Sequence, residues 1–241
     1  MRKLLLVMAV VGLSFAAMSM AQALSLGSGT VVAGLNTGYG WWGRLVTTAT
    51  INAQSLPGVV VSGKITDLDP DGLVWVEIGL IPKATYDYWQ TAYGGAYKYA
   101  VYDKGIQVVN WSSDGLGLSL QENGGSAKGG KDGGYAWPLS EPTSGSPWSF
   151  AVRMSPGGST GGTASLYVEG ATIYPKNGNL QLSYQGDYSQ AYLIAQIWTN
   201  TPNGKFSFTD VKAETVPEPM SVFLGVMGLG SVAGLRRFRR K

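Results

Sequence analysis

The 241-residue chain contains no cysteine and no histidine. Without cysteine there is no disulfide bond and no lipid-bearing residue of a lipoprotein, so burial of apolar side chains and sheet hydrogen bonding must stabilise the fold. The missing histidines, together with the missing cysteines, exclude the Ser-His-Asp and Cys-His hydrolase sites and the usual zinc sites. Paired carboxylates remain available as a catalytic arrangement.

Charge is also scarce, and the two ends of the chain hold much of the positive charge. At the beginning, Arg2 and Lys3 precede an uncharged, mostly apolar run over residues 4–17, and Ala21-Gln22-Ala23 follows as a small-x-small pattern. These are the three parts of a secretory signal peptide, which we predict over residues 1–23. The apolar run is too short to span a bilayer comfortably, so we expect cleavage rather than a permanent anchor.

The last part of the chain combines an apolar run with a basic cluster. Residues 220–235 carry no charge, and the chain closes with Arg236, Arg237, Phe238, Arg239, Arg240 and Lys241. A helix over this run would reach about 24 Å at ~1.5 Å per residue. Because the hydrocarbon core is ~30 Å thick, such a helix spans it with local thinning or with snorkelling arginines. Basic clusters stay on the cytoplasmic side, so the body of the protein would face outward.

The triplet Pro217-Glu218-Pro219 stands directly before this apolar run. Together with the short helix, the basic end and the signal peptide, it makes residues 216–241 resemble the PEP-CTERM sorting domain. The resemblance implies that exosortase, a membrane protease, is a partner that processes the chain at the triplet. It also implies an exopolysaccharide-producing, biofilm-forming bacterium, with the protein held in the cell membrane and then placed at the cell surface or released. An ordinary C-terminal membrane anchor is the alternative.

Without its two ends the chain is no longer basic. Of 18 Lys and Arg residues, two leave with the signal peptide and five with the basic cluster, which leaves 11. Of 15 Asp and Glu residues only Glu218 leaves, so the remaining body carries a net charge near −3. The basic character therefore belongs to sorting, and we expect no nucleic-acid binding.

Apolar and polar residues alternate with a period of two along much of the body. Strands are predicted over residues 45–51, 74–80, 97–109, 148–154, 164–173, 180–184, 191–198 and 205–213. Asn203-Gly204 and Asn177-Gly178 supply turn residues that tolerate positive φ. No segment of the body shows a long helical periodicity. The pattern predicts one all-β domain over residues 24–215, a two-sheet antiparallel β-sandwich.

Three of these segments carry a second resemblance. Residues 148–154, 164–170 and 206–212 are similar to strands of the concanavalin A-like lectin/glucanase jelly roll. This resemblance implies a jelly-roll-like sandwich and favours sugar binding. It carries no active site over, because the Glu-x-Asp-x-x-Glu strand of the glucanase branch is absent here. An immunoglobulin-like or other sandwich is the alternative fold.

Asp67, Asp69 and Asp71 precede Gly72 at the spacing of the first half of a calcium loop. Carboxylates at alternate positions can surround Ca²⁺, and glycine permits the sharp turn. The position where that pattern needs a glutamate is Ile78. We therefore favour a polar turn that enters the next strand, with a calcium site as the alternative; no other cofactor is expected.

Aromatic residues concentrate between positions 86 and 102, where six of the thirteen tyrosines lie. Tyr88, Trp89, Tyr93 and Tyr97 are the candidates for a carbohydrate-binding surface, since flat rings with a polar tip stack on sugars and donate hydrogen bonds. The alternative, which we favour, is that strand tyrosines cover the sandwich and pair across strands.

Three functional classes follow from these observations. The first is a non-enzymatic exported surface or extracellular-matrix protein that exosortase sorts and that is associated with exopolysaccharide. The second is a carbohydrate-binding module, which should present exposed aromatic rings on one sheet. The third is a glycan hydrolase or lyase, which should hold two carboxylates about 5 to 10 Å apart across a cleft.

Overall fold

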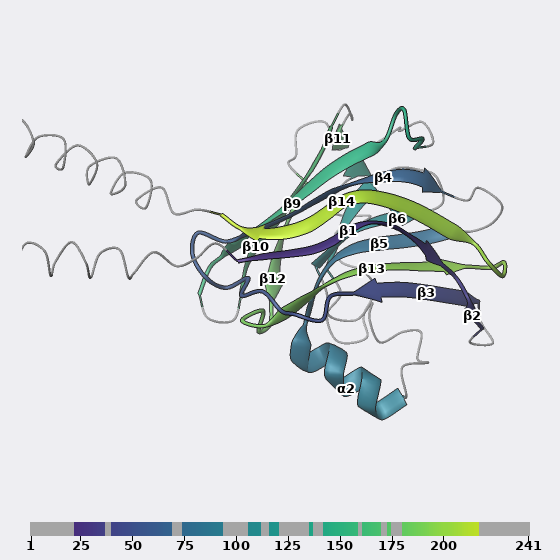
Figure 1. Ribbon diagram of the computed structural model, residues 1–241. Helices are drawn as coiled ribbons and strands as arrows, with labels where there is room; N and C mark the ends of the chain where they lie inside the picture. The colour runs from purple at the N-terminus through teal and green to yellow at the C-terminus, as the bar shows by residue number, and fades with distance from the viewer. Residues whose placement is uncertain are drawn as a thin grey trace, which may run out of the picture.

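The computed structural model describes residues 22–36, 40–68, 74–93, 106–111, 116–120, 135–136, 142–158, 161–169, 173–174 and 180–216. These residues form two antiparallel sheets that pack face to face (Figure 1). The all-β, two-sheet antiparallel sandwich predicted from the alternation is thus confirmed, and its strand order is consistent with a jelly roll. The segment predicted to be a signal peptide, up to Ala21, the Pro217-Glu218-Pro219 triplet, the 220–235 run and the basic cluster lie outside these residues.

The two sheets differ in size, and non-consecutive strands neighbour each other in both. The six-stranded sheet runs in the order β1 (Ala23–Val32), β14 (Lys205–Thr215), β4 (Val59–Leu68), β9 (Trp148–Pro156), β10 (Gly161–Val168) and β12 (Leu180–Gln185). The eight-stranded sheet runs in the order β11 (Ile173–Tyr174), β8 (Tyr135–Ala136), β7 (Leu116–Leu120), β6 (Ile106–Trp111), β5 (Val74–Pro82), β13 (Ala191–Thr199), β3 (Trp41–Val46) and β2 (Leu35–Asn36).

The main core lies between the sheets and follows the period of two. On β9, Trp148, Phe150, Val152 and Met154 are all buried, while Arg153 between them is exposed. Residues from β4, β5, β13 and β14 join the same cluster. Because the chain has no cysteine, burial of apolar area in this layer stabilises the fold without disulfide bonds.

One prediction about the strands is wrong in part. Residues 45–51 were expected to form a strand, yet β3 ends at Val46. After it, the Thr47 hydroxyl donates to the Ala49 carbonyl oxygen at 2.9 Å and accepts from the Leu193 backbone N–H at 3.1 Å. The Thr47 backbone N–H still donates to the Leu193 carbonyl oxygen at 3.0 Å, but the Thr47 hydroxyl replaces the backbone acceptor of Leu193, and the next β-bridge is the isolated one between Ile51 and Ala191. Strands β1 and β4 were not predicted.

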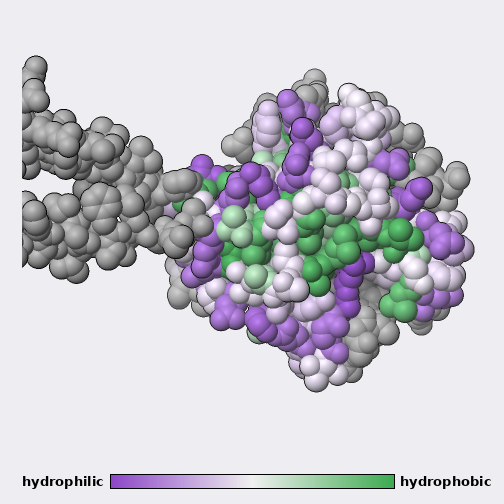
Figure 2. Space-filling model, viewed as in Figure 1, coloured by the Kyte–Doolittle hydropathy of each residue, from purple (hydrophilic) through white to green (hydrophobic). Residues whose placement is uncertain are grey.

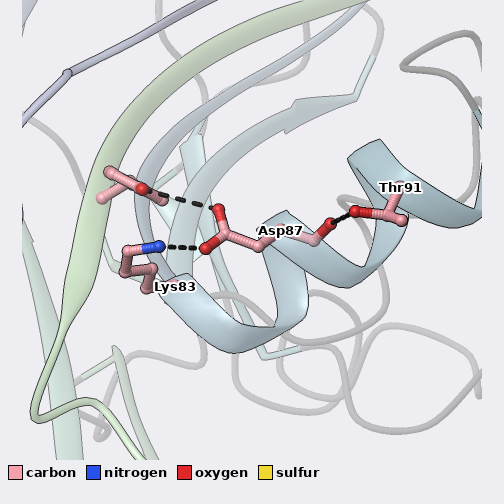
Figure 3. A network of polar contacts seen from close by, with 4 residues as sticks. Lys83, Asp87 and Thr91 are labelled. Atoms are coloured by element: carbon pink, nitrogen blue, oxygen red, sulfur yellow. Dashed lines mark hydrogen bonds and ion pairs between the residues drawn. The ribbon is translucent and has the colours of Figure 1, made fainter.

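A helix, α2 (Lys83–Tyr93), follows β5 directly and contradicts the expectation of strand tyrosines in this segment. Lys83 and Asp87 form an ion pair one turn apart, and the Thr91 hydroxyl donates to the Asp87 carbonyl oxygen at 3.0 Å (Figure 3). The helix packs its Tyr86 with Ile81, Ile194, Val46 and Tyr192 of the eight-stranded sheet. Tertiary packing thus outweighs the strand preference of the aromatic residues.

The two sheets also meet along one side, where the edge strand β1 approaches β3. A Cβ atom added to Gly43 would lie 1.9 Å from the Val32 carbonyl oxygen, so only glycine allows this backbone approach. Val32, Leu35 and Leu45 are among the exposed large apolar residues. Figure 2 shows hydrophobic residues gathered across the side of the molecule on which β1 and β3 lie.

Within the described ranges, no helix is long and apolar enough to cross a membrane. The helix predicted over residues 220–235 is not among them, so its membrane role stays a prediction.

Candidate functional site

The outer face of the eight-stranded sheet carries a row of tryptophan positions from four neighbouring strands. Trp42 of β3 pairs with Trp198 of β13, Trp198 pairs with Trp75 of β5, and Trp75 pairs with Trp111 of β6. Directly paired positions belong to the same face of a sheet. The residues next to Trp75 and Trp198, namely Val76 and Ile197, belong to the core, so the row belongs to the outer face. We call these four positions the tryptophan row.

The middle of this row is held tightly by the backbone. Trp198 is half-buried, and a Cβ atom added to Gly40 would lie 2.3 Å from its Nε1 atom. Gly40 also has a φ of 150°, a conformation that side chains rarely adopt. The indole of Trp198 therefore lies directly against the Gly40 backbone, which fixes the orientation of the ring. Trp42 beside it is also half-buried.

A polar row lies two residues further along the same strands. Arg44 of β3 pairs with Gln196 of β13, and Gln196 pairs with Glu77 of β5. Glu77 and Gln196 are only 1% and 2% exposed, so this carboxyl group is sealed from solvent. Gln196 Nε2 donates a hydrogen bond to Glu77 Oε2. Glu77 Oε1 has no hydrogen-bond partner within the described part of the chain.

The surroundings of Glu77 determine its protonation. Burial raises the pKa of Glu77 to about 8, and the hydrogen bond from Gln196 offsets part of the rise. The desolvation cost of a buried carboxylate favours the neutral acid. At neutral pH Glu77 is therefore an uncharged carboxylic acid that is buried next to Gln196 and is not available to a ligand.

Aromatic and cationic groups continue the same face toward α2. The Arg44 guanidinium lies 5.4 Å from the centre of the Tyr86 ring, and Tyr86 meets Tyr192 edge to face at 5.2 Å. Asp87 accepts hydrogen bonds from Lys83 and, at 3.5 Å, from the Tyr192 hydroxyl (Figure 3). The hydrogen bond to Asp87 is also the main reason that the pKa of Lys83 is raised. These contacts attach the helix to the sheet and border the tryptophan and polar rows.

The structure describes only some of the residues predicted from the sequence to bind carbohydrate. Tyr88 lies on α2 with 62% of its surface exposed, so at least this ring faces solvent. Trp89 and Tyr93 lie on the same helix by their backbone, and Tyr97 lies outside the described residues. None of the four belongs to a strand of the described sheets. Their role in sugar binding stays a prediction.

The tryptophan row could not be predicted from the sequence, because its members are far apart along the chain. All four members of the row lie at or next to the end of a strand, but so do Trp41 and Trp148, which are not in the row. Tryptophans at strand ends weakly indicate a shared edge of the sheet, but strand order and register decide whether these residues pair. Neither is visible from a period of two.

The metal hypothesis rests largely outside the described residues. Asp67 is exposed near the end of β4 and pairs with Ser207, whereas Asp69 and Asp71 are not described. Among the residues that are described, no group of three acidic residues could hold a metal ion. Calcium binding stays a prediction.

No protein-family model matches the chain, and no curated protein matches it in sequence. Solved structures with a similar chain arrangement include the metal-free carbohydrate recognition domain of Emp46p, with 9% identity and a TM-score of 0.45 over 82% of this chain and 88% of that one. The legume lectin-like domain from Entamoeba histolytica is similar with 10% identity and a TM-score of 0.44, over 81% and 90%. A glycoside hydrolase family 16 endo-glucanase from Bacteroides ovatus is similar with 8% identity and a TM-score of 0.40, over 80% and 84%. At these identities the likeness concerns the fold alone.

Proposed function

We propose that the chain is an exported, non-enzymatic surface protein whose β-sandwich binds polysaccharide on the outer face of the eight-stranded sheet. The observation that carries the proposal is the tryptophan row. Neighbouring strands lie about 4.8 Å apart, so four paired positions extend over about 14 Å. That length suits several units of a linear glycan better than a single sugar.

One member of the polar row, Arg44, also supports polysaccharide binding on this face. Sugar recognition combines aromatic rings, which stack on apolar sugar faces, with a few polar groups that set orientation. Here Arg44 of β3 is half-buried and lies two residues from Trp42, whereas its neighbours in the polar row, Gln196 and Glu77, are sealed from solvent and cannot contact a ligand.

A glycan hydrolase is the second candidate, because a buried glutamic acid with a raised pKa is typical of a general acid. Such an enzyme needs a second carboxylate about 5 to 10 Å away. The other acidic side chain described on this face is Asp87, which contacts Tyr192. Glu77 is also only 1% exposed, so its carboxyl group cannot reach a glycosidic bond of a substrate on the surface. This burial favours binding over hydrolysis.

The proposed localisation is inferred from the sequence at the two ends of the chain. The signal peptide at residues 1–23, the Pro217-Glu218-Pro219 triplet and the apolar run support export, membrane tethering and exosortase as a partner. A protein delivered in this way to a polysaccharide-rich surface would meet its ligand there.

Binding to the exopolysaccharide of the producing bacterium should weaken about tenfold or more when Trp198 is changed to alanine. The change removes the ring of Trp198, one of the two inner positions of the row, and a tenfold loss corresponds to about 1.4 kcal/mol. Affinity electrophoresis in gels containing the exopolysaccharide measures the effect, and a thermal melt of each variant checks folding.

The matched control is Tyr167→Ala, because Tyr167 is 61% exposed on β10 of the other sheet. It should bind as the unchanged protein does. Tyr88→Ala and Trp89→Ala test the helix site predicted from the sequence. If these two changes abolish binding and Trp198→Ala does not, the ligand lies on α2 and the sheet-face site is wrong.

Replacing Pro217, Glu218 and Pro219 by alanines should leave the protein unprocessed and held in the membrane. The triplet is where the sorting resemblance places cleavage, so its loss removes the recognition element. Mass spectrometry of protein from an exosortase-containing host reads the C-terminal peptide. Released, unaltered protein that still ends at Lys241 would contradict exosortase sorting.

A further inference from the structure

Both ends of the sandwich leave the fold at one place. The Thr215 backbone N–H donates to the Gln22 carbonyl oxygen at 3.0 Å, and the Gln22 N–H donates to the Thr215 hydroxyl at 3.0 Å. The Val216 N–H donates to the Gly58 carbonyl oxygen at 2.9 Å. Figure 1 shows the start of β1 and the end of β14 side by side at the left of the molecule. We call this end of the sandwich, with the 52–58 loop, the tether end.

The 52–58 loop is ordered by its own hydrogen bonds. The Asn52 side chain accepts from the Gln54 N–H at 2.9 Å, the Ser55 hydroxyl donates to the Asn52 carbonyl oxygen at 2.9 Å, and the Gly58 N–H donates to the Ser55 carbonyl oxygen at 2.9 Å. The Gln54 side chain also donates to the Gly186 carbonyl oxygen at 3.0 Å. The loop is therefore anchored within itself and to its neighbour.

This anchored loop holds Leu56 outward. Leu56 is 70% exposed, the highest value among the exposed large apolar residues of the described sandwich. A leucine kept in water by an ordered loop leaves apolar area uncovered at a cost, since burying a leucine side chain is worth about 1.5–3 kcal/mol. An apolar environment against this loop would remove that area from water.

The length of chain beyond Val216 identifies that environment. The apolar run begins at Met220, four residues after Val216. Four residues span at most about 14 Å even when fully extended. The hydrogen bond of Val216 to the Gly58 carbonyl oxygen fixes where the chain leaves the sandwich. If the apolar run is inserted in a membrane, that point of the sandwich lies within about 14 Å of the start of the run.

We propose that the tether end rests on the outer leaflet of the cell membrane, with Leu56 inserted at the boundary between headgroups and acyl chains. This inference rests on the membrane tether of the proposed function. Insertion buries Leu56, as apolar side chains of interfacial segments are buried. It also gives the tethered protein a fixed orientation rather than a free swivel on residues 217–219.

The orientation places the tryptophan row away from the membrane. Ala191 begins β13 at the tether end, where it bridges to Ile51, and Trp198 follows seven residues later. At about 3.4 Å per residue, the row lies about 24 Å further out. The glycan site would then open toward the surrounding matrix while the tail is still in place.

The chain has no cysteine, so Leu56→Cys carries a single thiol for an environment-sensitive fluorophore. The full chain is reconstituted into phosphatidylethanolamine/phosphatidylglycerol vesicles, with and without lipids that bear a quencher near the headgroup. The control is Asn200→Cys, which is exposed in the turn between β13 and β14, at the opposite end. The label at position 56 should shift to the blue and lose most of its emission to the quencher, whereas the label at position 200 should do neither.

Vesicle flotation tests the membrane tether separately from the contact of Leu56 with lipid. If the protein floats with the vesicles and the label at position 56 behaves like that at position 200, the tether end does not touch lipid and the inference is overturned, while the tether stands. If the protein does not float, the tether of the proposed function fails and the inference fails with it. Polysaccharide binding by the sheet face is measured separately and is unaffected by either outcome.

Discussion

The free energy of unfolding should fall by roughly 5 kcal/mol between pH 4 and pH 8.5 through Glu77 alone. Its pKa is about 8 in the folded protein, against 4.5 for the free side chain. Between these values the unfolded chain has released the proton and the folded protein still holds it, so stability decreases as pH rises. At about 1.36 kcal/mol per pH unit, the interval sets the size of the effect. Below pH 4.5 both states are protonated and the contribution is flat.

The variant Glu77→Gln isolates this effect. Glutamine keeps the shape and the acceptor for Gln196, and it does not titrate. Denaturant unfolding at several pH values should show that the unchanged protein loses stability toward alkaline pH and that the difference from Glu77→Gln follows the predicted slope. Glu169→Gln is the matched control, because Glu169 is exposed after β10, and it should retain the slope. Equal slopes in the unchanged protein and Glu77→Gln would show that Glu77 ionises normally.

Changing Phe208 to alanine should lower the free energy of unfolding by about 3–5 kcal/mol. Phe208 is 1% exposed on β14, and its ring centre lies 5.8 Å from that of Phe206. A Cβ atom added to Gly29 of β1 would lie 3.5 Å from the Phe208 ring, so the ring packs directly beneath that edge strand. Removing it leaves a cavity that the two sheets cannot close without moving.

Urea or guanidinium unfolding measures this loss as a lower midpoint. Tyr167→Ala again serves as the comparison, because it removes an aromatic ring that is 61% exposed. Its effect should stay within about 0.5 kcal/mol, as for most surface changes. A loss of less than about 1 kcal/mol for Phe208→Ala would mean that β1 and β14 do not depend on this ring.

Local pattern was enough to predict most of the sheet. On β9, β13 and β14 the alternation of apolar residues agrees with the observed strands, because side chains of a strand point alternately to its two faces. Asn203 in the turn before β14 has a φ of 63°, as predicted from the Asn203-Gly204 sequence. The missing cysteines and histidines likewise excluded disulfide bonds and several catalytic sites before any fold was known.

Other features depended on residues brought together from distant parts of the chain. The helix α2 forms where aromatic residues suggested strands, since its Tyr86 packs against Tyr192 and Ile194 of β13. Glu77 reads as an ordinary polar position of an alternating strand. Only its pairing with Gln196 inside a covered face makes it a neutral, buried acid.

The sequence alone determined that the body is all-β and has no disulfide bonds, and it predicts a signal peptide and a membrane-sorting segment at the two ends. It could do so because strand alternation, signal peptides and apolar runs are properties of neighbouring residues. The tertiary structure decided where function can reside. Strand order and register place Trp42, Trp198, Trp75 and Trp111 in one row, and hydrogen bonds from Thr215 and Val216 place both ends of the described sandwich beside the 52–58 loop. These are long-range pairings, and a one-residue change of register would have sent each side chain to the other face.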